Sequence, residues 1–186
     1  SGPQDRDETL LGHKPFLVLA DHFTRKGIPV LRFDDRGVGK SKGDFNKATS
    51  ADFATDAFAA MEYLANRKEI DSKRIGLAGH SEGGLIAPMV AAEHPDKTAF
   101  IVMLAGTGAK GDAIIERQTQ EIGKASGATR EGLEVSARLQ KLLMDTARSQ
   151  PDEAAAKKAL AGVAVTFAKK LSEAEKKALE IEDNSD

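Results

Sequence analysis

The feature that most restricts the fold of this chain is a serine between two glycines, in "GLAGHSEGGLIAP" at positions 76 to 88. An apolar run precedes the serine and another follows it, so the chain must turn sharply between two buried elements. The pattern Gly-x-Ser-x-Gly is typical of a strained strand-to-helix turn that exposes the serine hydroxyl, with glycines where side chains would collide. It therefore predicts that Ser81 is a nucleophile.

The same pattern occurs a second time, in "GKSKG" at positions 39 to 43, and its context differs. Ser81 directly follows "RIGLAG" and directly precedes "GLIAPMVAA", whereas Ser41 is followed by the polar "DFN", which is typical of a loop. "GVGKS" also resembles the end of a phosphate-binding loop. That motif requires a glycine at position 34, where Asp34 would repel a phosphate. A glycine-rich turn is therefore favoured over a nucleotide-binding site.

Composition and charge exclude several classes of protein. A chain of 186 residues, 40% hydrophobic and 30% charged, is typical of a soluble globular domain with or without a small appendage. The formal net charge of -2 argues against nucleic acid or anionic lipid as a partner. No apolar run is long enough to predict a membrane span. The polar start "SGPQDRDETL" is no signal peptide, so the compartment stays open between the cytoplasm and export after removal of a signal.

Cysteine chemistry and metal binding are not expected. The chain has no cysteine, which excludes disulfides, thiolate catalysis and cysteine metal sites. Its four histidines lack the spacing of metal ligands. The sequence therefore predicts neither a metal nor another cofactor.

The chain changes composition near position 111, because all aromatic residues except Phe167 precede it. The first part alternates between predicted helices and strands, and this alternation predicts parallel strand pairing through right-handed crossovers. The second part is rich in Ala, Lys and Glu and predicts helices only. The predicted strands are 28–33, 74–79 and 98–106, and the predicted helices are 16–27, 50–67, 83–95, 112–125, 130–148, 151–169 and 173–181.

Four motifs, "SGPQDRD", "VLRFDDRGVGKS", "RIGLAGHSEGG" and "IVMLAGTG" in this order, resemble the α/β-hydrolase superfamily. The chain is similar to bacterial serine esterases and acyl hydrolases whose core opens with a GSGPQDRD-like loop. The resemblance implies a partial α/β-hydrolase fold over 1–110, with parallel strands and flanking helices, and a helical lid over 111–186. Asp35 and Arg36 are interpreted as holding their loop together by hydrogen bonds.

The resemblance also implies site residues. Ser81 matches the nucleophile, and the backbone N–H of Glu82 matches one oxyanion-hole donor. The second donor is expected from Gly2, or from Ser1, in the opening loop, since Pro3 has no N–H.

The resemblance implies an acid and a histidine after the serine, yet no histidine follows position 94. His80 lies within the serine turn, with its side chain expected to face away from the reacting side, and His13 precedes the serine. No residue of this sequence is well placed to take the proton of the Ser81 hydroxyl. We therefore expect a fragment of a longer hydrolase, nearly inactive alone, which lacks its acid, its base and a strand between those that carry Phe33 and Leu77.

Two functions remain open. The first is a serine hydrolase that cleaves small-molecule carboxylic esters, or alternatively thioesters or amides, through an acyl-enzyme on Ser81. Its expected partner is the remaining part of its own hydrolase core, present as a separate segment. The alternative is a non-catalytic, hydrolase-like binding module without a complete triad.

Overall fold

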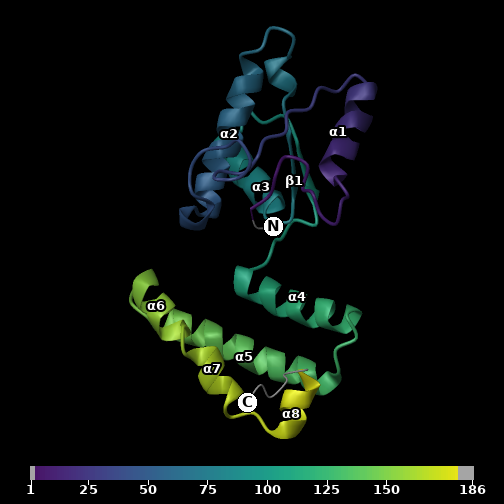
Figure 1. Ribbon diagram of the computed structural model, residues 1–186. Helices are drawn as coiled ribbons and strands as arrows, with labels where there is room; N and C mark the ends of the chain where they lie inside the picture. Colours follow the sequence, from purple (N-terminus) through teal and green to yellow (C-terminus); the bar gives the residue numbers. More distant parts are fainter. Residues whose placement is uncertain (1–2, 180–186) are drawn as a thin grey trace. The chain divides into compact units, whose positions relative to one another are not determined.

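The structure, a computed structural model, describes residues 3–179. The chain forms two compact units, Ser1–Gly108 and Ala109–Asp186 (Figure 1). Helices occur in both units, and the strands that the structure describes lie in the first. In the part of the chain that is described, none of the helices has the length and apolar character needed to cross a bilayer.

The first unit is built on a two-stranded parallel sheet. Strand β1 (Leu77–His80) pairs with β2 (Ile101–Leu104), with Leu77 opposite Ile101 and His80 opposite Leu104. Helix α3 (Gly83–Glu93) connects the two strands. The alternation of helix and strand in the sequence predicted this parallel crossover, and the structure confirms it.

The core of the first unit lies between the sheet and two helices. Helix α2 (Ser50–Ala65) packs against α3, and α1 (Pro15–Arg25) lies on the other side of β1 in the view of Figure 1. A capping box between Thr49 and Asp52 begins α2. Short 3-10 helices η1 (Phe45–Lys47) and η2 (Ser72–Arg74) flank it. The buried core residues are Ala54, Ala57, Met61, Ile75 and Val90.

The predicted strand over 28–33 is wrong for the described structure. These residues follow α1 but pair with no other segment of residues 3–179 in a ladder. A strand is defined by hydrogen bonds to a neighbouring strand, and an apolar, β-branched run alone does not supply them. Without a neighbour, Leu31 and Phe33 are 36% and 43% exposed.

Over residues 109–179 the second unit is all helical, as its composition predicted. Its helices are α4 (Gly111–Ala125), α5 (Arg130–Arg148), α6 (Glu153–Leu160), α7 (Val163–Ala168) and α8 (Glu173–Ala178). The single helix expected over 151–169 is divided into α6 and α7, because Gly162 is a poor helix former. Asp152 begins α6 by accepting a hydrogen bond from the Ala155 N–H, 2.8 Å away. Pro151 therefore precedes the N-cap instead of occupying the first turn.

One carboxylate joins the last helix of this unit to α5. Glu175 forms an ion pair with Arg138 and accepts hydrogen bonds from the Ser172 backbone N–H, 2.8 Å away, and the Ser172 hydroxyl, 2.9 Å away. The Ser172 backbone N–H, together with Arg138 and the Ser172 hydroxyl, lowers the pKa of Glu175 to about 2. A group with a depressed folded pKa stabilises the fold at higher pH, where it is ionised.

We predict that Glu175→Gln lowers the melting temperature at neutral pH, and that the difference from the wild type shrinks as the pH falls from about 4.5 toward 2. Thermal unfolding followed by circular dichroism between pH 2 and 7 measures this difference. Glu173→Gln is the matched control, because this acid lies on the same helix and forms an exposed ion pair with Lys176. A constant difference across the pH range would contradict the assignment.

Candidate active site

Ser81 lies in a strained turn between β1 and α3. Its φ is +53°, in the left-handed region that non-glycine residues adopt only at a cost of about 1–3 kcal/mol. Its backbone N–H donates to the Leu104 carbonyl, 2.9 Å away, and its own carbonyl accepts from the Gly84 N–H, 3.0 Å away. The turn is therefore fixed both to the neighbouring strand and to the first turn of the helix. The Ser81 residue is half-buried.

Close backbone packing forces glycine at some positions of the motif and not at others. A Cβ at Gly79 would overlap the Gly83 carbonyl, and one at Gly84 would overlap the Gly106 backbone. A Cβ at Gly83 would meet no atom within 4 Å. The sequence prediction that both glycines beside the serine are sterically required is thus correct for Gly79 and wrong for Gly83, because α3 has already turned away there.

We predict that Gly79→Ala lowers the free energy of unfolding by about 3 kcal/mol, because the added methyl group displaces the turn. Gly83→Ala is the matched control, two residues beyond Ser81, and should leave stability nearly unchanged. Urea unfolding of both variants measures the difference. Equal losses in both would contradict the close approach at Gly79.

No histidine of residues 3–179 donates to or accepts from the Ser81 hydroxyl. His80 bonds to Glu8 through Nδ1, with an Nδ1–Oε1 distance of 3.0 Å. His94 stacks on the Phe58 ring with centroids 3.5 Å apart. His13 lies in the loop before α1, His22 lies in α1, and both are exposed. The described chain therefore contains a strained serine without a bonded histidine.

Glu82 follows the serine and is the N-cap residue of α3. Its backbone N–H therefore lies at the positive end of a helix, where negative charge is favoured. Its carboxylate accepts a hydrogen bond from the Ser50 hydroxyl, 2.6 Å away, at the start of α2. Gly2, from which the sequence predicts the second donor, lies outside the described residues.

Asp34 organises the two loops beside the serine turn. This buried carboxylate accepts from the Arg6 backbone N–H (2.9 Å), from Nε and Nη2 of the Arg6 side chain (2.9 and 2.7 Å), and from the Lys40 backbone N–H (3.1 Å). The hydrogen bonds from Arg6 hold the pKa of Asp34 well below its usual range. Sequence reasoning missed this role, because the partners come from two loops about thirty positions apart.

Asp35 and Arg36 hold the same region together, as interpreted from the sequence. The Gln4 N–H donates to the Asp35 carboxylate over 3.0 Å, and the Asp35 N–H donates to the Gln4 carbonyl over 3.1 Å. Burial, with the Glu82 and Asp56 carboxylates adding a smaller effect, raises the pKa of Asp35. The Arg36 guanidinium bonds the Asp56 carboxylate at 2.7 and 2.8 Å.

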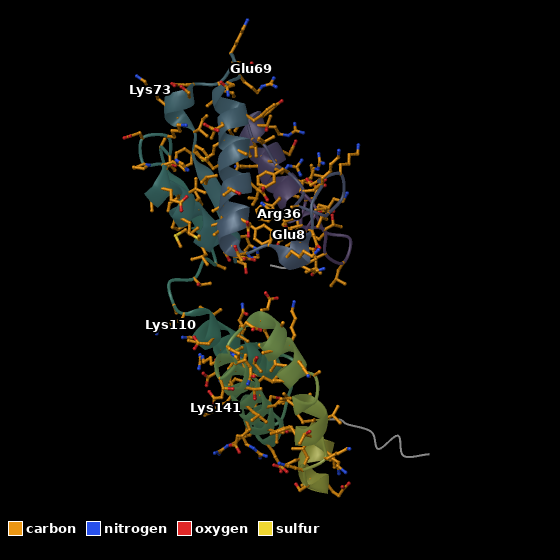
Figure 2. The ribbon with its side chains drawn as sticks, turned by 90° about the vertical axis from the view of Figure 1, so that its left-hand side faces the viewer. Glu8, Arg36, Glu69, Lys73, Lys110 and Lys141 are labelled. Atoms are coloured by element: carbon orange, nitrogen blue, oxygen red, sulfur yellow. The ribbon has the colours of Figure 1, made fainter. Side chains whose placement is uncertain are left out.

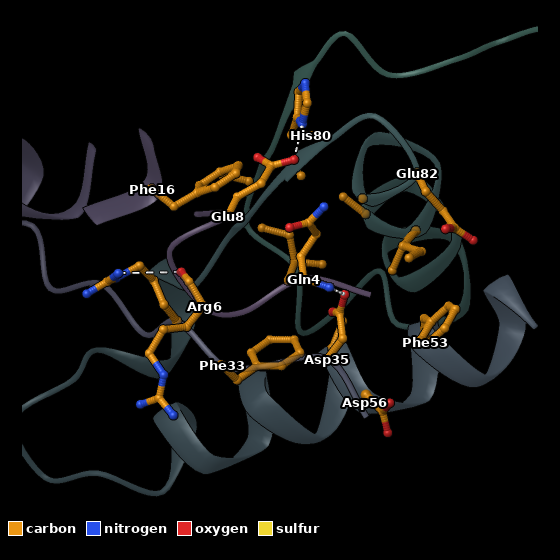
Figure 3. A pocket seen from close by; sticks show the side chains of 18 of the residues that line it. Gln4, Arg6, Glu8, Phe16, Phe33, Asp35, Phe53, Asp56, His80 and Glu82 are labelled. Atoms are coloured by element: carbon orange, nitrogen blue, oxygen red, sulfur yellow. Dashed lines mark hydrogen bonds and ion pairs between the residues drawn. The ribbon is translucent and has the colours of Figure 1, made fainter. Parts of the chain in front are cut away.

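These loops gather at one end of the first unit. Figure 2 places Glu8 and Arg36 at this end and Glu69 and Lys73 at the opposite end. A cavity of about 240 Å³ lies there between the opening loop, residues 31–33, α2, α3 and β1 (Figure 3). The residues before and after Ser81 in the sequence, His80 and Glu82, line this cavity, whereas Ser81 itself does not. Residues 3–179 hold no group of three or more potential metal ligands.

We predict that Asp34→Asn lowers the melting temperature at neutral pH by removing the charge that pairs with Arg6. Because the folded pKa of Asp34 is depressed, this stabilisation is complete above about pH 4 and is lost as the pH falls toward that folded value. Melting curves at pH 7 and pH 3 test this. Asp21→Asn, on the exposed face of α1, is the control. Equal effects of the two variants would contradict the role of Asp34.

Comparisons with known proteins cover most of the chain. The profile of the serine aminopeptidase S33 family, Hydrolase_4, matches residues 14–183. Esterase EstD of Thermotoga maritima is 31% identical over 129 residues, which are 68% of this chain and 30% of EstD. A 31.7 kDa protein of Escherichia coli is 31% identical over 58% of this chain and 37% of its own length.

A further similarity is shorter. Inactive dipeptidyl peptidase 10 of Rattus norvegicus is 40% identical over 67 residues, which are 34% of this chain and 8% of that protein. The chain thus spans about a third, or less, of the length of these curated relatives.

Proposed function

Since the chain belongs to the serine aminopeptidase S33 family of the α/β-hydrolase superfamily, we propose that it forms part of a serine hydrolase that cleaves carboxylic esters. The esterase among its relatives supports an ester substrate, and the family name makes an amide the next substrate to test. The observation that carries the proposal is the positive φ of Ser81, at the point where β1 turns into α3.

In the proposed reaction, the Ser81 hydroxyl attacks the ester carbonyl carbon and forms a tetrahedral intermediate. The Glu82 N–H and a second N–H from the loop that contains Gly2 stabilise its oxyanion. Collapse of the intermediate releases the alcohol and leaves an acyl group on Ser81, which water then removes. A serine hydroxyl needs a base to take its proton. Because no histidine of the described residues bonds to Ser81, we assign the acid and base to sequence outside these 186 residues.

We propose that the second unit is the lid of this hydrolase. Its helices carry exposed apolar side chains, which offer surface for the acyl part of a substrate. The most exposed of them are Ile115, Ile122, Leu142 and Val165.

A non-catalytic binding module is the second candidate. It is supported by the similarity to a relative named an inactive peptidase. Both candidates share the fold, so only the reactivity of Ser81 separates them.

The test uses a fluorophosphonate probe, which forms a covalent bond with an activated serine, on the protein expressed from its complete gene. We expect labelling of the wild type, loss of labelling in Ser81→Ala, and a fall of about 10³-fold or more in hydrolysis of p-nitrophenyl esters. Ser41→Ala is the matched control, since its serine stands in the second Gly-x-Ser-x-Gly match. Labelling that persists in Ser81→Ala, or a folded wild type that never labels, would refute the enzyme and favour the binding module.

A further inference from the structure

A side-chain contact joins the opening loop to His80, the residue before Ser81. Glu8 and His80 are 72 positions apart, and the Glu8 carboxylate lies 3.0 Å from the His80 Nδ1. The Phe16 ring packs beside the imidazole, with centroids 6.2 Å apart. Figure 3 shows Glu8, Phe16 and His80 together at one side of the cavity.

The chemistry of the two groups fixes the direction of this hydrogen bond. An ionised carboxylate can only accept, so Nδ1 carries the proton that is shared with Glu8. The bond is charge-assisted and therefore stronger than a bond between neutral groups. The Glu8 side chain is 17% exposed and the His80 side chain 40%, so the bond is shielded from water on the Glu8 side.

The backbone at Glu8 is strained. Its φ is +49°, which a non-glycine residue adopts at a cost of about 1–3 kcal/mol and only when its surroundings hold it there. The Glu8 N–H donates to the Asp5 carbonyl over 3.0 Å, which closes a tight turn in the loop. This turn aims the carboxylate at the end of β1. Strain of this kind is concentrated at functional sites.

The opening loop is thus attached at several places, which include an ion pair between Asp7 and Arg32. Gln4 and Arg6 bind Asp35 and Asp34, and Glu8 binds the strand end that carries Ser81. We propose that Glu8 and His80 are positioning residues that hold the opening loop, from which the second oxyanion donor is expected, at a fixed distance from Ser81. This inference rests on the proposed function.

The pair has the composition of an acid–histidine dyad. Because His80 makes no hydrogen bond to the Ser81 hydroxyl within the described residues, we assign it a positioning role and not that of the base. Its effect passes through the backbone that His80 and Ser81 share. Because displacing a catalytic group by about 1 Å can cost about 10²-fold in rate, loosening the loop should slow acylation.

The test measures the second-order rate constant for fluorophosphonate labelling, together with the melting temperature, in the protein from the complete gene. Glu8→Ala removes the acceptor, and we expect a rate about 10- to 100-fold lower. Glu8→Gln keeps an oxygen that accepts from Nδ1–H and should restore most of the rate. Likewise, His80→Asn, which keeps an N–H near the Nδ1 position, should be faster than His80→Ala.

A double-mutant cycle tests whether the residues act through one another. Glu8→Ala with His80→Ala should be no slower than the slower single variant. The matched control is Glu62→Ala. Glu62 lies on α2, outside the site, and forms an exposed ion pair with Lys97. The labelling rate of this variant should equal that of the wild type. The proposal is overturned if Glu8→Gln is as slow as Glu8→Ala, if the two losses multiply, or if Glu8→Ala lowers the melting temperature without slowing labelling.

Amide hydrogen exchange separates this proposal from the proposed function, because it does not depend on catalysis. Glu8→Ala should speed exchange of the amides of residues 4–9 and 81–82 while leaving α2 unchanged. A wild type that never labels would refute the hydrolase and leave this readout intact. Unchanged exchange in the opening loop would refute the role of the pair.

Discussion

The left-handed backbone of Ser81 is the constraint on which the first unit depends. The chain must reverse within three residues, from the end of β1 to the start of α3, and a single non-glycine residue carries the strain. The turn is held by a hydrogen bond to Leu104 on the neighbouring strand, and by backbone approaches at Gly79 and Gly84 that are too close for any side chain. The strand, the helix and the neighbouring strand therefore meet at this turn.

Carboxylates organise the loops around this turn. Asp34 and Asp35 bind backbone N–H groups and a guanidinium of the opening loop, Glu8 binds the end of β1, and Glu82 binds the start of α2. Each bond joins segments that are far apart in sequence. Because ionised acids accept several hydrogen bonds at once, they can fix loops that lack regular structure.

Much of this arrangement was accessible from the sequence. The apolar runs beside Ser81 predicted a strand, a turn and a helix, and the helix predicted over 50–67 corresponds to α2. Sequence reasoning failed where a distant partner decides the outcome. Residues 28–33 have the pattern of a strand, but the described structure places no strand beside them. The contact between Glu8 and His80 spans 72 positions, and no local sequence pattern indicates it.

The sequence by itself determined the periodic elements and the residue that occupies the strained turn, because apolar spacing, caps and glycines act over a few neighbouring residues. The tertiary structure alone decided which glycines are indispensable, which carboxylates hold the loops, and that Glu8 lies against His80, the residue before Ser81. Those outcomes depend on the approach of groups separated by tens of positions, and local patterns carry no information about such distances.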